Sequence, residues 1–175
     1  MRKIIIFIFL VLIFICSCSE KNKTESYWLE KEKALWDGKQ YTDPKKAIEY
    51  LNNAIKLQPN NADTYTKRGA AYYNLGQYQQ AIESHDMAIR LKQDYASAYN
   101  NRGAAYIKLG KYQRAIEDCN KAIGLKQDYL SAYNNRGITY FKQGNNKLGC
   151  PDAQKACKLG NCKLLELAKG KGWCR

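Results

Sequence analysis

The sequence has few residues that could perform chemistry. It contains a single histidine, His85. There is no Ser or Cys beside it in a nucleophile elbow, and no pair of carboxylates has a spacing that suggests catalysis. It has no glycine-rich phosphate loop and no C-x-x-C pair of the kind that redox enzymes use. We therefore expect a non-enzymatic protein with no catalytic residue and no cofactor.

The sequence also has no apolar run long enough to span a bilayer. The run from Ile4 to Ile15 follows a basic start and is shorter than the roughly 18 to 20 residues that a membrane helix needs. It is typical of a secretory signal peptide, here residues 1–17. The Cys-Ser-Cys sequence that follows resembles a bacterial lipoprotein processing site. The resemblance implies a lipid on Cys18, because the small Ser17 precedes it; Cys16 after the bulky Ile15 is the alternative, and an uncleaved anchor or a plain signal peptide is another.

The resemblance also implies a location. Ser19 follows the modified cysteine, as in lipoproteins that are sorted to an outer membrane. Residues 18–26 are polar and without periodicity, which predicts a flexible tether. We expect an exported protein, lipid-anchored in the bacterial envelope at the periplasmic face of the outer membrane.

The chain is strongly basic, with a net charge of +13. It contains no nucleic-acid-binding motif, and its export signal argues against a nucleic-acid partner. Residues 142–175 include eight Lys or Arg residues and only two acidic residues, Asp152 and Glu166. This end would favour acidic lipids, peptidoglycan or an acidic partner, unless it is simply a solvated surface.

One block of sequence recurs at a fixed period. Tyr65-Thr-Lys-Arg-Gly-Ala-Ala-Tyr returns 34 residues later from Tyr99 and again from Tyr133. The units that begin near Tyr65 and Tyr99 each have a Leu-Gly turn in the middle, Leu75-Gly76 and Leu109-Gly110, followed by apolar residues at helical spacing. A period of this length predicts a solenoid of helical hairpins. The units are residues 27–61, 62–95, 96–129 and a degenerate unit within 130–175.

The repeat resembles the tetratricopeptide repeat (TPR) family. The family's small and aromatic positions are occupied in register by Tyr99, Gly103, Tyr106, Ala115 and Ala122. The resemblance implies an all-α, right-handed superhelix of helix-turn-helix hairpins. It also implies a concave groove lined by the first helix of each hairpin, and an interaction scaffold as the function.

The terminal units depart from the family pattern. Glu32 stands where the first unit should have its glycine. In the last unit Pro151 interrupts the second helix, which we expect to start late, near that proline. A short helix over Lys163 to Lys169 would then cover the apolar edge of the last hairpin, as solenoid ends require.

Four cysteines crowd the C-terminus, and export would permit disulfides. Cys150 and Cys157 lie about 10 Å apart on one helix, too far to bond to each other. An antiparallel closing helix would pair Cys150 with Cys174 and Cys157 with Cys162. A zinc site is the alternative, but its usual close cysteine pairs are missing. Cys119 and His85 share a core-facing repeat position and are expected to be buried fillers.

By the TPR resemblance, the groove offers amides, lysines and aromatic rings to a partner. Amides bond a peptide backbone in either direction, and the lysines favour an acidic segment of another envelope protein. Some TPR adaptors hold a C-terminal carboxylate with a five-residue clamp, of which this chain keeps only Asn101. The predicted groove residues are Thr66, Tyr73, Asn74, Asn100, Asn101, Lys108, Asn134, Asn135, Phe141 and Lys142.

Arg68, Arg102 and Arg136 recur before each glycine and are expected to bind acids such as Glu83 and Glu117 between hairpins.

The runner-up function is a Sel1-like, cysteine-rich repeat protein that binds cell-wall material or β-lactams. Those repeats carry one bridge in each unit, whereas here the cysteines cluster at the end.

Overall fold

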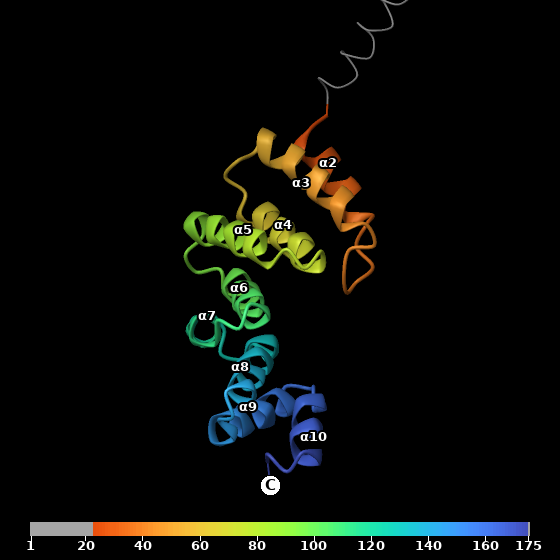
Figure 1. Ribbon diagram of the computed structural model, residues 1–175. Helices are drawn as coiled ribbons and strands as arrows, with labels where there is room; N and C mark the ends of the chain where they lie inside the picture. Colours follow the sequence, from red (N-terminus) through yellow and green to blue (C-terminus); the bar gives the residue numbers. More distant parts are fainter. Residues whose placement is uncertain (1–22, 175) are drawn as a thin grey trace, which may run out of the picture.

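The computed structural model describes residues 23–174, which form a row of helical hairpins from one end of the molecule to the other (Figure 1). The predicted signal peptide, Cys16 and Cys18 lie outside this range. Within it, none of the helices has the length and apolar character needed to cross a membrane. The helices are α2 (Glu25–Lys33), α3 (Pro44–Leu57), α4 (Ala62–Asn74), α5 (Tyr78–Leu91), α6 (Ala96–Lys108), α7 (Tyr112–Leu125), α8 (Leu130–Lys142), α9 (Asn146–Lys158) and α10 (Lys163–Gly170).

Three of the turns inside the hairpins follow from a glycine at the same repeat position. After α4, Gly76 adopts a φ of 74°, and the Gln77 N–H donates to the Tyr72 carbonyl at 2.9 Å. This is the Schellman arrangement, in which a left-handed glycine allows the next residue to cap the helix end. Gly110 and Gly144 repeat the geometry, with φ of 71° and 74°. The repeat of a local signal therefore sets the repeat of the hairpin.

Small residues let the two helices of a hairpin approach closely. Ala81 and Ala88 of α5 are fully buried, as are their counterparts in α7. A Cβ at Gly69 would lie 2.4 Å from the His85 ring, and one at Gly103 would lie 3.3 Å from Cys119 Sγ. His85 and Cys119 thus fill the space that the glycines leave, as their shared repeat position predicted.

The first hairpin replaces the missing glycine with a polar network. Glu32 is 2% exposed, and its carboxylate accepts hydrogen bonds from the Tyr41 hydroxyl and from Lys67 Nζ. Tyr41 comes from the long turn between α2 and α3, so the extra loop residues supply the partner that a buried carboxylate needs. The helix α2 begins at Glu25, inside the predicted tether of 18–26, because the Thr24 side chain caps it by accepting from the Tyr27 N–H.

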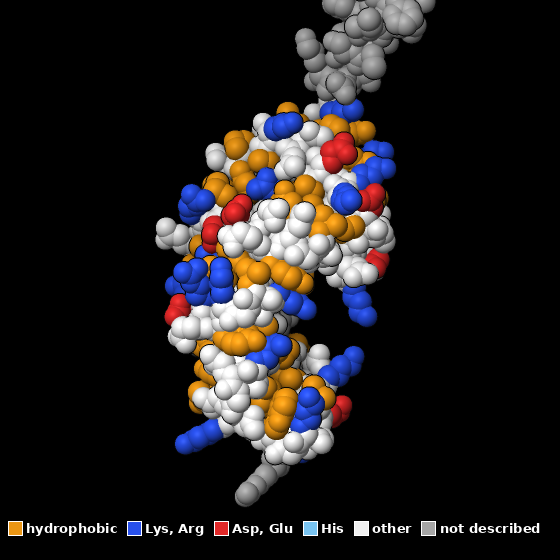
Figure 2. Space-filling view, viewed as in Figure 1, with side chains coloured by type: hydrophobic (Ala, Val, Ile, Leu, Met, Phe, Trp, Pro, Cys, Tyr) orange, Lys and Arg blue, Asp and Glu red, His pale blue; other side chains and the backbone are white. Residues whose placement is uncertain are grey.

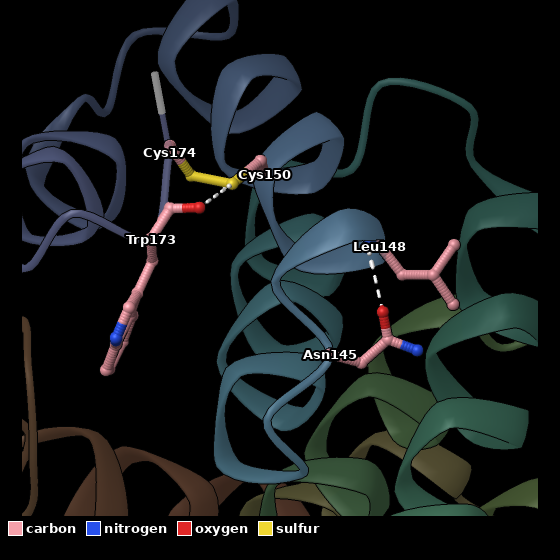
Figure 3. The surroundings of a disulfide bond; sticks show 5 residues. All are labelled: Asn145, Leu148, Cys150, Trp173 and Cys174. Atoms are coloured by element: carbon pink, nitrogen blue, oxygen red, sulfur yellow. Dashed lines mark hydrogen bonds between the residues drawn. A yellow bond between two sulfur atoms is a disulfide. The ribbon is translucent and has the colours of Figure 1, made fainter.

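The prediction that the second helix of the last unit starts near Pro151 was wrong. The helix α9 begins at Asn146, and Pro151 lies inside it. The Asn145 side chain accepts from the Leu148 N–H at 3.2 Å and so caps the start of α9 (Figure 3). Pro151 and the residue four positions before it are both exposed, so water can reach the carbonyl that loses its N–H partner.

Two disulfides hold the C-terminal helix α10 and the residues after it against α9. Cys150 is bonded to Cys174 and Cys157 to Cys162, as predicted. The Cα atoms of the two pairs lie 5.6 and 3.9 Å apart. Beside the first bridge, the carbonyl oxygen of Trp173 lies 3.1 Å from Cys150 Sγ, while the indole ring points away (Figure 3). That ring stacks on Phe141 of α8 and closes the core of the last unit.

Candidate functional site

The candidate site is a series of hollows along the first helices of the hairpins, which we call the groove. Its walls come mainly from α2, α4, α6, α8 and α10. The space-filling view shows the outline of the molecule indented on the side where α10 lies (Figure 2). Four hollows contribute, and three of them share Ile138 of α8.

The hollow nearest the N-terminus has a volume of about 320 Å³. Thr66 and Asn101 lie in its wall together with Trp36 and Tyr41 from the long first turn. Burial and the neighbouring Glu32 raise the pKa of Tyr41, so its hydroxyl remains a hydrogen-bond donor. This part of the groove combines an exposed indole with an amide.

The middle hollow has a volume of about 420 Å³ and lies between α4, α6 and α8. Tyr73, Lys108, Asn135, Ile138 and Lys142 contribute to its wall. The Tyr73 ring packs edge-on against Tyr78, with centroids 5.3 Å apart, and burial raises the pKa of its hydroxyl. An apolar floor with two ammonium groups at its edge suits an apolar side chain flanked by carboxylates.

The C-terminal hollow has a volume of about 410 Å³ and separates α8 from α10. Asn134, Asn135 and Ile138 face Lys163 and Leu167 across it. An adjoining hollow of about 220 Å³ lies between Ile138, Lys142, Leu167 and the indole of Trp173. The disulfide-bonded cap therefore provides one wall of the groove.

Three side-chain amides connect two neighbouring units, two of them in the groove walls and one buried behind them. The Asn135 amide donates to Asn100 at 2.9 Å, and Asn100 donates to Asn101 at 3.2 Å. Asn100 is 5% exposed and does not line a hollow. The Oδ1 atom of Asn134 is buried without a hydrogen-bond partner among the described residues. Asn100 thus positions two groove amides from behind.

Three of the predicted groove residues have a different role in the structure. Asn74 lines none of the described hollows, and its side chain accepts from the Tyr41 N–H at 3.2 Å. Asn100 is buried, as described above. Phe141 is part of the wall of the hollow of about 220 Å³, but it is only 7% exposed because Trp173 and the cap cover its ring, so it mainly packs in the core of the last unit. The other predicted residues lie in the walls of the hollows.

The residues at both ends of the groove are not indicated by the repeat pattern. Trp36 and Tyr41 come from a turn that is longer than the repeat allows, and Lys163, Leu167 and Trp173 come from the cap. None of these positions has a counterpart in the 34-residue repeat. The isolated tryptophans were a signal that could have indicated them, because a large aromatic ring outside the repeat pattern requires a partner.

The recurring arginines join neighbouring hairpins, but their acidic partners are not the predicted ones. Arg102 contacts both Asp118 oxygens, at 2.6 and 2.8 Å, and Asp86 at 2.6 Å. The predicted partners Glu83 and Glu117 are exposed, because a change of one residue on a helix turns the side chain by about 100°. Arg136 repeats the arrangement with Asp152, while Arg68 bonds Ser84 and Asn52.

Two buried titratable groups without a charged partner, His85 and Cys119, are held in their neutral forms. Burial and the positive charge of Arg102 lower the pKa of His85 to about 3. Burial raises the pKa of the Cys119 thiol to about 12. A neutral imidazole and a protonated thiol in the core are packing groups, as the sequence predicted.

Comparison with known proteins supports the repeat assignment. Family models match the chain as "Tetratricopeptide repeat" over residues 96–129 and as "TPR repeat" over residues 44–76 and 71–110. No curated protein sequence matches the chain significantly.

The solved structures similar to the chain are helical repeat proteins. A crystal structure of MamA has a TM-score of 0.71 and 27% identity, with 90% of this chain and 85% of that chain covered. The Arabidopsis OM64 TPR domain has a TM-score of 0.61 and 28% identity, with 63% and 92% covered. The first TPR of Spaghetti (RPAP3), bound to the HSP90 peptide SRMEEVD, has a TM-score of 0.65 and 23% identity, with 69% and 94% covered. The chain belongs to the tetratricopeptide-repeat family.

Proposed function

We propose that the chain is a non-enzymatic scaffold of the bacterial cell envelope that binds an acidic segment of another envelope protein in the groove. The observation that carries the proposal is the meeting of three hollows at Ile138, with lysines at their edges. Interaction modules of the TPR family are typically non-enzymatic. The neutral, buried state of His85 and Cys119 fits such a role.

The chemistry of the hollows favours a segment with an apolar anchor and neighbouring carboxylates. Ile138 and Leu167 offer an apolar floor, while Lys108, Lys142 and Lys163 stand at the edges of the hollows. An anchor side chain in a desolvated pocket supplies most of the affinity, and the charges supply orientation. The bound RPAP3 peptide is also acidic, but this chain keeps only Asn101 of the carboxylate clamp, so we expect an internal segment as the partner.

The envelope location rests on the sequence. The basic start, the apolar run and Cys18 support export and lipid attachment, with the outer membrane as the proposed site. Because both disulfides are confined to the last unit, the Sel1-like alternative has no structural observation in its favour.

A photo-crosslinking experiment in intact cells tests the groove. A photoreactive amino acid replaces Ile138 in one variant and the exposed Gln79 on α5 in a matched control. We expect a discrete crosslinked partner from position 138 alone, lost in the variant Lys108→Glu/Lys142→Glu. Equal crosslinking from both positions, or no effect of the charge reversal, would contradict the proposal.

A further inference from the structure

The two ends of the solenoid differ in whether another element covers the terminal hairpin. At the C-terminal end, α10 and two disulfides cover the last hairpin. At the N-terminal end, no described element covers the outer side of α2 and α3. The ends of a solenoid normally carry a polar outer face, because an apolar end face promotes aggregation.

The uncovered end presents aromatic and apolar side chains. A hollow of about 530 Å³ is lined there by Tyr27, Trp28, Tyr50 and Leu57. We call these four residues, together with Lys23, Lys31 and Lys56, the end patch. Tyr27 is 37% exposed and Leu57 is 51% exposed. The Trp28 ring centroid lies 5.1 Å from that of Tyr27 and 5.7 Å from that of Tyr50.

Lysines surround these rings. Lys23 Nζ lies 5.0 Å from the Trp28 ring centroid, and Lys31 Nζ lies 5.8 Å from that of Tyr27. Lys56 lines the same hollow, and Glu49 is the one acidic residue among its lining residues. The end patch is therefore cationic and aromatic. This combination suits the headgroup region of a bilayer, where Trp and Tyr rings bury their apolar part and lysines meet anionic lipids.

The proposed membrane attachment would hold this face near a bilayer. Four residues lie between Cys18 and Lys23, so the two positions are five Cα–Cα steps apart, which span at most about 18 Å when fully extended. If the apolar run ending at Ile15 stays uncleaved, seven residues lie between Ile15 and Lys23, and the eight Cα–Cα steps span at most about 29 Å. Either form of attachment keeps the end patch close to the membrane surface.

We propose that the end patch of α2 and α3 docks on the anionic headgroup surface of the membrane that holds the chain. This inference rests on the proposed membrane attachment and is independent of the groove. Docking would cover the open end of the solenoid. It would also fix the direction of the groove, because the hairpins follow one another away from α2 toward α10 (Figure 1).

Tryptophan fluorescence in vesicles tests the docking. The full chain is reconstituted in phosphatidylcholine vesicles that carry acyl-brominated lipid, with or without phosphatidylglycerol. The variant Trp36→Phe/Trp173→Phe retains Trp28 alone, and Trp28→Phe/Trp36→Phe retains Trp173 alone as the distant control. We expect bromine to quench Trp28 in the phosphatidylglycerol vesicles and to leave Trp173 unquenched.

Two further arms test the role of charge. Quenching of Trp28 should be lost at about 0.5 M NaCl, where the screening length falls to a few ångströms, and this arm needs no lysine substitution. It should also be lost in Lys23→Glu/Lys31→Glu/Lys56→Glu. The control Lys121→Glu/Lys147→Glu/Lys158→Glu carries the same charge change on exposed positions of α7 and α9 and should retain the quenching.

Each alternative outcome overturns the docking. If the chain stays with the vesicles and Trp28 is quenched no more than Trp173, the attachment stands but the end patch does not dock. If quenching survives both salt and charge reversal, proximity to the anchor explains it and the headgroup contact is wrong. If the chain leaves the vesicles altogether, both the attachment and the docking fail, while the groove crosslink from position 138 remains a separate result.

Discussion

Replacing Arg102 by alanine should destabilise the protein far more than the equivalent change in the preceding unit. The guanidinium of Arg102 contacts both oxygens of Asp118 and one of Asp86. Asp118 is 5% exposed, so the variant would leave a buried carboxylate without its partner. Breaking a buried ion pair from one side costs about 3–5 kcal/mol. In a chain of this size that corresponds to a fall in Tm of roughly 6–20 °C.

Arg68 provides the comparison within the same chain. It donates to Ser84 and Asn52, which are neutral, so Arg68→Ala leaves no buried charge behind. The lost hydrogen bonds should cost about 1–2 kcal/mol. Arg68 and Arg102 lie over a tyrosine ring of their own helix, at 5.1 and 5.5 Å, so the loss of ring contact is similar in both variants. The difference between the losses of unfolding free energy in Arg102→Ala and Arg68→Ala therefore measures the cost of leaving the Asp118 carboxylate buried without its partner.

The assay is urea unfolding followed by circular dichroism at two pH values. Burial already raises the pKa of Asp118, and its bonds to Arg102 oppose that rise. Without Arg102 the folded pKa rises further, so the cost of Arg102→Ala should be complete at neutral pH and smaller in acid, where Asp118 takes up a proton. The double variant Arg102→Met/Asp118→Leu should regain most of the lost stability. If Arg102→Ala costs no more than Arg68→Ala at neutral pH, the reasoning is refuted.

Three other predictions concern the core and the cap. Because the pKa of His85 is lowered to about 3 from its usual 6.5, the unfolded chain binds a proton that the folded chain does not; stability should fall as pH drops from 6.5 toward 3, and less so in His85→Leu, measured by urea midpoints. The Cys119 thiol, with its pKa raised to about 12, should react with a thiol reagent no faster than the protein unfolds, and rapid reaction in native buffer would contradict its burial. Cys150→Ser/Cys174→Ser removes a bridge between residues 24 apart and should cost about 3 kcal/mol, with the loss of hydrogen-exchange protection confined to α9 and α10.

Much of the fold could be predicted because the same local signals recur in register. The Leu-Gly turns, the pairs of buried alanines and the glycine contacts with His85 and Cys119 each occur in two successive units, so the assignment of one unit supports that of the other. The disulfide pairing followed from helix geometry together with the expectation that the closing helix runs antiparallel to the helix before it. The continuation of α9 through Pro151 could not be predicted in this way, because tolerance of the proline depends on exposure in the folded protein. The cap at Asn145 is a local signal that the sequence contains.

The groove was less predictable than the fold. A repeat position specifies the helix face of a residue, but not how far its neighbour covers it. Asn100 occupies a groove position, yet the amide of Asn135 from the next unit lies over it. Phe141 is covered in the same way by Trp173, which belongs to no repeat. In both cases the covering group lies 32 to 35 residues away in the sequence, beyond the reach of local pattern.

The ends of the groove are where this chain differs most from a regular repeat. Internal units supply amides and alanines that recur with the period, whereas Trp36, Lys163, Leu167 and Trp173 occur once each. A terminal hairpin lacks one neighbour, so it must be completed by residues that the repeat does not provide. Those same residues form the end walls of the groove. We therefore expect substitutions at Trp36 and Leu167 to change which partner is bound, and substitutions at the internal amides to change how tightly it is bound.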